Sequence, residues 1–125
     1  MIQIAILAGF LLAALINLLP VAGVLGAGQL EKLYGVEVVG QDMAILLRHR
    51  ALLFAIVGVL LGAAAFMPPL RSAAFCAGMV SMVGFIVLRT LEGGSNAALA
   101  RVAAVDYVGI AALAVAGLLM VVRPA

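Results

Sequence analysis

The stretch "DMAILLRHRALLFAIVGVLLGAAAFMPPL", residues 42–70, contains an apolar run long enough to cross a membrane as a helix. An α-helix needs about 20 residues to span about 30 Å of hydrocarbon. Asp42 is a favourable N-cap residue for such a helix. The two prolines after Met67 end it, because proline lacks the backbone amide that the helix needs. The stretch therefore predicts a transmembrane helix over residues 42–67.

Three more apolar runs of similar length flank this one, at residues 2–24, 71–91 and 99–122. The whole chain is 68% hydrophobic and 10% charged, whereas soluble domains are about a quarter charged. The connections between the runs are short, so neighbouring helices are expected to be antiparallel. We therefore predict an all-α integral membrane four-helix bundle with antiparallel up-down-up-down topology, forming a single domain over residues 1–125.

The longest connection contains "QLEKLYGV", residues 29–36, in which Leu30, Leu33 and Tyr34 are apolar and Glu31 and Lys32 are charged. This pattern fits a short helix lying in the membrane interface. It fits an ordinary solvated loop equally well, and both readings stay open. The third connection, "EGGSN" at residues 92–96, has the glycines that separate one helix from the next.

Basic residues are distributed unequally between the two ends of such a bundle. The end with the two termini has Arg71 and Arg123, whereas the end with the first and third loops has five basic residues, Lys32, Arg48, Arg50, Arg89 and Arg101. Positively charged residues are concentrated in cytoplasmic loops of membrane proteins. The sequence therefore predicts a multi-pass protein whose first and third loops lie in the cytoplasm.

The polar residues near helix ends also gather at the end with the first and third loops. A charged side chain at the bilayer centre costs about 2.5 to 3.5 kcal/mol even on the lenient insertion scale, so such groups face the bundle interior, pair or reach the interface. We predict a polar, ligand-binding pocket at this end, formed by five residues: Arg48, Asp106, Arg89, Asn17 and His49.

Helical spacing separates the two arginines of "RHR". Steps of three or four residues from Arg48 reach a row of small residues, Ala51, Ala55, Gly58 and Gly62. The same steps from Arg50 reach a bulky row, Phe54, Val57 and Leu61. We therefore predict that Arg48 faces inward and pairs with Asp106, while Arg50 faces lipid. Such a pair either fixes the helix register or belongs to a ligand site.

Gly58 and Gly62 form a GxxxG pattern, which lets two membrane helices approach closely. The pattern predicts tight helix packing at these glycines. It also predicts a homo-oligomer if the face is free, and the alternative is that a helix of the same chain fills it.

Several function classes lack support in these residues. The seven basic residues form no run that would follow a nucleic-acid backbone, so we predict no nucleic-acid partner. One histidine and one cysteine, Cys76, supply no metal-binding set, and we predict no metal site. Motifs for nucleotide binding, zinc proteolysis and serine hydrolysis are absent, and no catalytic residue or cofactor is indicated.

The apolar composition, without a catalytic motif, favours a non-enzymatic protein in contact with membrane lipid. We predict that it binds a hydrophobic or amphipathic small molecule, or that it is an accessory subunit of a larger membrane complex. An integral-membrane enzyme acting on a lipid or quinone is the alternative, and a small oligomeric transporter is a third.

The segments "NLLP" (17–20), "LYGV" (33–36), "LLRHRALLF" (46–54) and "AAVDYVG" (103–109) resemble a family of small bacterial four-span inner-membrane proteins of unknown function. The chain more loosely resembles DoxX-like four-helix membrane proteins. The resemblance implies a location in the bacterial inner (plasma) membrane. Members of the closer family sometimes carry the label phosphopantetheine adenylyltransferase, which these residues do not support, because that enzyme needs an HxGH motif and this chain has only His49.

Overall fold

A computed structural model describes residues 1–122, and in this part of the chain every regular element is a helix. The elements follow one another as α1 (Ile2–Leu18), η1 (Leu19–Leu25), α2 (Ala27–Tyr34), α3 (Gly40–Phe66), η2 (Pro68–Leu70), α4 (Arg71–Leu91) and α5 (Ala97–Val122). Here η marks a 3₁₀ helix.

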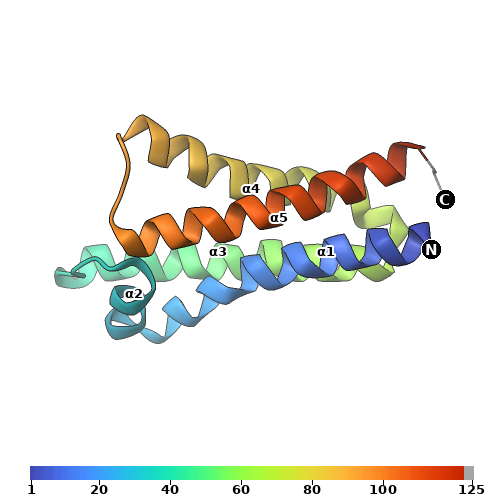
Figure 1. The fold of residues 1–125 in the computed structure, drawn as a ribbon. Coiled ribbons are helices and arrows are strands. Elements are labelled where there is room, and N and C mark those ends of the chain that lie inside the picture. The colour runs from blue at the N-terminus through green and yellow to red at the C-terminus, as the bar shows by residue number, and fades with distance from the viewer. Residues whose placement is uncertain (123–125) are drawn as a thin grey trace.

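Four helical segments are long and apolar enough to cross a membrane: Ile2–Leu25, Gly40–Phe66, Pro68–Leu91 and Ala97–Val122. They pack as one bundle, and the N-terminus and the end of α5 lie at the same end of it (Figure 1). The all-α four-helix architecture and the membrane class are therefore confirmed. The protein is a small integral membrane protein with four candidate spans.

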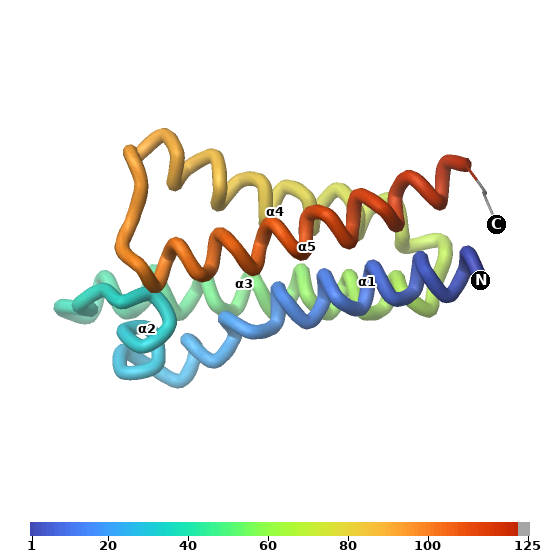
Figure 2. Tube along the Cα trace, viewed as in Figure 1, coloured from blue at the N-terminus to red at the C-terminus, as the bar shows by residue number. Residues whose placement is uncertain are grey.

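The first span changes its helix type before it ends. α1 gives way to η1 at Leu19, and Pro20 is in the first turn of this 3₁₀ helix. Proline has no amide hydrogen, so the α-helical hydrogen bond from residue 20 cannot form. The chain then turns back through α2 before α3 begins, a path that the tube of Figure 2 shows clearly.

The helix bounds differ from the predicted ranges by a few residues at several ends. α4 covers residues 71–91 as predicted, whereas α5 begins two residues earlier than predicted, at Ala97. α3 also begins earlier, at Gly40, and its N-cap residue is Val39. The prediction that Asp42 caps α3 is therefore wrong. Asp42 lies instead in the first turn, where its carboxylate complements the positive end of the helix dipole.

The connection between the first two spans contains a short helix, α2, over most of the "QLEKLYGV" segment. α2 ends at Tyr34, and the next residue, Gly35, caps it in a left-handed conformation with φ +62°, which glycine adopts without steric cost. Leu30 and Tyr34, one helical turn apart, are both buried. α2 is therefore packed against the bundle by its apolar side.

The core lies between the four spans, and α1 is the most buried of them. The fully buried side chains of the core come from all four spans and include Ile6, Phe10, Leu61, Met82 and Leu113. Many other large apolar side chains are exposed on the outer faces, such as Ile56 and Leu118. In a bilayer these side chains contact lipid tails, so their exposure carries no hydrophobic penalty.

Gly58 of α3 lies close to α1. A Cβ atom at Gly58 would lie 2.5 Å from the Leu18 side chain of α1, whereas at Gly62 the nearest atom would be the Ala14 Cβ at 3.9 Å. A helix of the same chain therefore occupies this face. A second copy of the protein would have to bind elsewhere.

Candidate functional site

A pocket of about 720 Å³ lies between α3 and α4, at the end of the bundle that carries α2 and the α4–α5 loop. Most of its lining is apolar, including Leu47, Leu53 and Val57 from α3 and Val80 and Leu88 from α4. Its volume is in the usual range for small-molecule sites, about 300 to 1,000 Å³. Size and lining therefore suit a largely apolar ligand.

The pocket exists because α4 separates from α3 along its length, as Figure 1 shows. At Gly78 the two helices touch, and a Cβ atom there would lie 3.0 Å from the Leu61 side chain. Less than two turns later, a Cβ atom at Gly84 would have no neighbour within 4 Å. Gly84 lines the pocket, so its missing side chain adds to the open volume.

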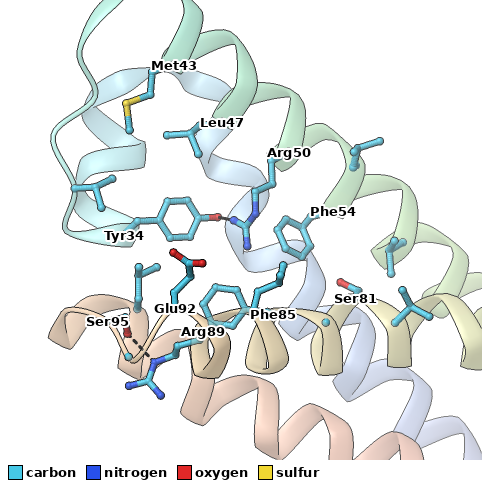
Figure 3. A pocket seen from close by; sticks show the side chains of 18 residues that line it. Tyr34, Met43, Leu47, Arg50, Phe54, Ser81, Phe85, Arg89, Glu92 and Ser95 are labelled. Atoms are coloured by element: carbon cyan, nitrogen blue, oxygen red, sulfur yellow. Dashed lines mark hydrogen bonds between the residues drawn. The ribbon is translucent and has the colours of Figure 1, made fainter.

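Arg50 is the central polar residue of the pocket. Its guanidinium donates a hydrogen bond to the Tyr34 hydroxyl. The guanidinium carbon is 4.6 Å from the centre of the Phe54 ring, 5.0 Å from that of Tyr34 and 5.7 Å from that of Phe85. Figure 3 shows these rings around the cation. Cation–π attraction to three rings fixes the position of the charge in a partly dehydrated site.

Tyr34 is held in place by Asn96. The Asn96 amide nitrogen donates to the backbone carbonyls of Tyr34, at 2.9 Å, and Gly35, at 3.0 Å. Its side-chain oxygen accepts from the Leu99 amide at 2.8 Å, as an N-cap residue does. One side chain thus caps α5 and fastens the end of α2. Burial raises the pKa of the Tyr34 phenol, against the opposing effect of the Arg50 charge, so Tyr34 is neutral at physiological pH.

Other polar groups line the pocket or lie directly behind it. Arg89 donates from Nε to the Ser95 hydroxyl at 2.6 Å, and Glu92 points its carboxylate into the pocket (Figure 3). The Ser81 hydroxyl, part of the lining, donates to Asn17 Oδ1 at 2.9 Å. Asn17 is itself buried and donates to the Ala13 carbonyl at 2.9 Å. Asn17 therefore supports the pocket wall from α1.

Of the five residues predicted for a polar pocket, Arg89 is part of the lining. Asn17 reaches the pocket only through Ser81. His49 is exposed. Asp106 is half-buried and interacts through space with the charge of Arg50, without a hydrogen bond to it. The pocket therefore lies at the predicted end of the bundle, but most of the five predicted residues do not line it.

The two arginines of "RHR" have the reverse of their predicted roles. Arg48 is exposed, and its Nε donates to the Val24 carbonyl at 2.8 Å, at the end of η1. Among the residues that the structure describes, Arg48 therefore binds the end of η1 and does not form the predicted inward pair with Asp106.

Arg48 and Arg50 differ from their predicted positions because α3 packs against neighbouring helices through two faces. Its small residues face α1, and the row from Arg50 to Leu61 faces α4, where Leu61 is fully buried. A bulky row is not by itself a sign of lipid contact. The spacing of Phe54 four residues after Arg50 could have predicted their contact, because residues four apart are neighbours on a helix surface. Tyr34, Phe85 and Glu92 come from other elements, and no local pattern predicted them.

Comparison with protein families, curated proteins and solved structures finds no match to this chain.

Proposed function

We propose that the protein binds an amphipathic small molecule in the pocket between α3 and α4, and that this binding is its function rather than catalysis. The observation that carries the proposal is the arrangement of the lining: a cation held by Tyr34, Phe54 and Phe85 at one end, and aliphatic side chains over the rest. A few placed polar groups in a mostly apolar cavity are typical of small-molecule sites.

The ligand enters from the bilayer. Leu53 and Val80 line the pocket and are nevertheless 47% and 74% exposed. In a membrane, that exposure is toward lipid tails, so the apolar part of the pocket is continuous with the hydrocarbon region. The resemblance to small bacterial four-span proteins stays a prediction, and it implies no ligand.

Gly84→Leu tests the proposal, because the leucine side chain would extend into the open volume. After purification in a mild detergent, we expect mass spectrometry to detect a stoichiometric amphiphile on the wild type and its loss from Gly84→Leu. The matched control is Ala73→Leu, at an exposed position on the same helix outside the pocket, which should retain the molecule. Equal retention by both variants would refute the proposed site. A co-purifying protein with no bound amphiphile would favour an accessory subunit instead.

We propose further that the pocket end of the bundle faces the cytoplasm of a bacterial cell, on the basis of the five basic residues predicted there. In a Cys76→Ala background, a single cysteine at Glu37, in the first loop, reports on the pocket end of the bundle. A single cysteine at Met67, before η2, reports on the opposite end. An impermeant maleimide added to intact cells is expected to label only the Met67→Cys protein. Labelling of Glu37→Cys alone would reverse the orientation.

A further inference from the structure

The pocket has charges of both signs at its polar end. Arg50 is inside it, and Glu92, one residue beyond the end of α4, points its carboxylate into it (Figure 3). Arg89 is near Glu92 in the sequence, but its guanidinium turns away from the Arg50–Tyr34 contact, toward Ser95. A purely anionic ligand would meet the Glu92 carboxylate and the field of Asp106 as well as Arg50.

The Arg50–Tyr34 pair is suited to an acceptor oxygen with negative charge. A guanidinium has five N–H donors in a planar fork, and among the residues that the structure describes Arg50 uses them in a single side-chain hydrogen bond, to Tyr34. Because the Tyr34 oxygen accepts that bond, its own O–H is free to donate. Donors from both residues therefore converge, as recognition of a phosphate or carboxylate requires.

Glu92 is suited to a cation that donates hydrogen bonds. The carboxylate is exposed at the pocket mouth, beside the carbonyl end of α4, where the helix dipole also favours positive charge. The three aromatic rings that would hold a quaternary ammonium already surround Arg50. A quaternary ammonium would thus have neither an aromatic cage nor an N–H to offer Glu92, whereas a primary ammonium has three N–H donors.

We propose that the ligand is a zwitterionic phospholipid with a primary ammonium, whose phosphate binds Arg50 and Tyr34 and whose ammonium binds Glu92. This inference rests on the proposed function and specifies its ligand class. The acyl chains follow the apolar lining past Leu53 and Val80 into the bilayer, since the exposed faces of these residues leave the cavity open on that side.

The test compares three lipids that share the same two oleoyl chains: phosphatidylethanolamine, phosphatidylcholine and phosphatidylglycerol. Titration of the detergent-solubilised protein, followed by native mass spectrometry, gives the affinity of the first bound lipid. We expect the wild type to bind phosphatidylethanolamine about tenfold more tightly than the other two, the factor expected for one charge-assisted hydrogen bond. Equal or tighter binding of either other lipid overturns the inference, and this comparison needs no variant.

Single substitutions then test which residue contacts the ammonium and which contacts the phosphate. Glu92→Gln is expected to remove the preference for phosphatidylethanolamine over phosphatidylcholine, while Glu37→Gln, at an exposed carboxylate outside the pocket, preserves it. Arg50→Gln is expected to weaken binding of all three lipids. A preference that survives in Glu92→Gln overturns the assignment of the ammonium.

Gly84→Leu distinguishes a failure of the proposed pocket function from a failure of the proposed ligand class. If it leaves binding of all three lipids unchanged, the proposed pocket function fails. If it blocks them while the wild type lacks the expected selectivity, the pocket function stands and only the zwitterionic ligand class fails.

Discussion

Replacing Arg71 with leucine is expected to lower the free energy of unfolding by about 2 to 4 kcal/mol, the cost of leaving two buried carbonyls without partners. In α3 the carbonyls of Ala64 and Ala65 would normally accept from residues 68 and 69, but both are prolines and have no amide hydrogen. Arg71 supplies the missing donors, from Nε to Ala64 at 3.0 Å and from Nη2 to Ala65 at 2.9 Å.

The arginine is suited to this position by its shape and charge. It is only 7% exposed, and its third contact, from Nη1 to Gln3 Oε1 at 3.0 Å, joins the turn to the start of α1. Its positive charge lies at the C-terminal end of α3, where the helix dipole favours a cation. The compact ammonium of lysine cannot reproduce the planar fork, so Arg71→Lys is expected to be intermediate.

Thermal and denaturant unfolding in detergent measure these differences. The control is Arg101→Leu, which removes an exposed arginine of α5 and should change stability by less than about 0.5 kcal/mol. An Arg71→Leu protein as stable as Arg101→Leu would show that water or detergent satisfies the two carbonyls. Gln3→Leu should cost less than Arg71→Leu, because it leaves both carbonyl contacts intact.

Gly9→Leu is expected to destabilise the bundle by about 3 kcal/mol, toward the upper end of the usual cost of overpacking. A Cβ atom at Gly9 would lie 2.8 Å from the Ala112 carbonyl oxygen and 2.9 Å from the Ala116 Cβ. The first of these atoms belongs to the backbone of α5, so a rotamer change cannot relieve the contact. α1 and α5 would have to separate, exposing buried side chains such as Phe10.

Gly84→Leu is the matched control for this prediction, because it makes the same substitution within a helix. Both variants gain the helix propensity of leucine over glycine, up to about 1 kcal/mol. At Gly84 no atom lies within 4 Å of the added Cβ, so this variant should be as stable as the wild type or more so. Comparable melting temperatures for the two variants would contradict the close α1–α5 contact.

The sequence by itself determined the class of the protein and placed the ends of its four spans to within a few residues. Apolar runs of membrane-spanning length allow only helices here, because backbone groups in lipid must be satisfied within their own segment. Proline and glycine then mark boundaries through local backbone chemistry, as Pro68 and Pro69 do after α3. The role of Arg71 could also be predicted in principle, since two prolines leave two nearby carbonyls without donors.

Tertiary structure alone decided which helix faces meet and therefore where the site is. The rows that begin at Arg48 and Arg50 are both helical, and periodicity does not say which partner each row packs against. The structure shows that α3 contacts α1 through one row and α4 through the other. The divergence of α4 beyond Gly78 and the approach of Tyr34 from α2 then create the pocket around Arg50. These are long-range contacts, which depend on how all four helices pack together and not on any local pattern.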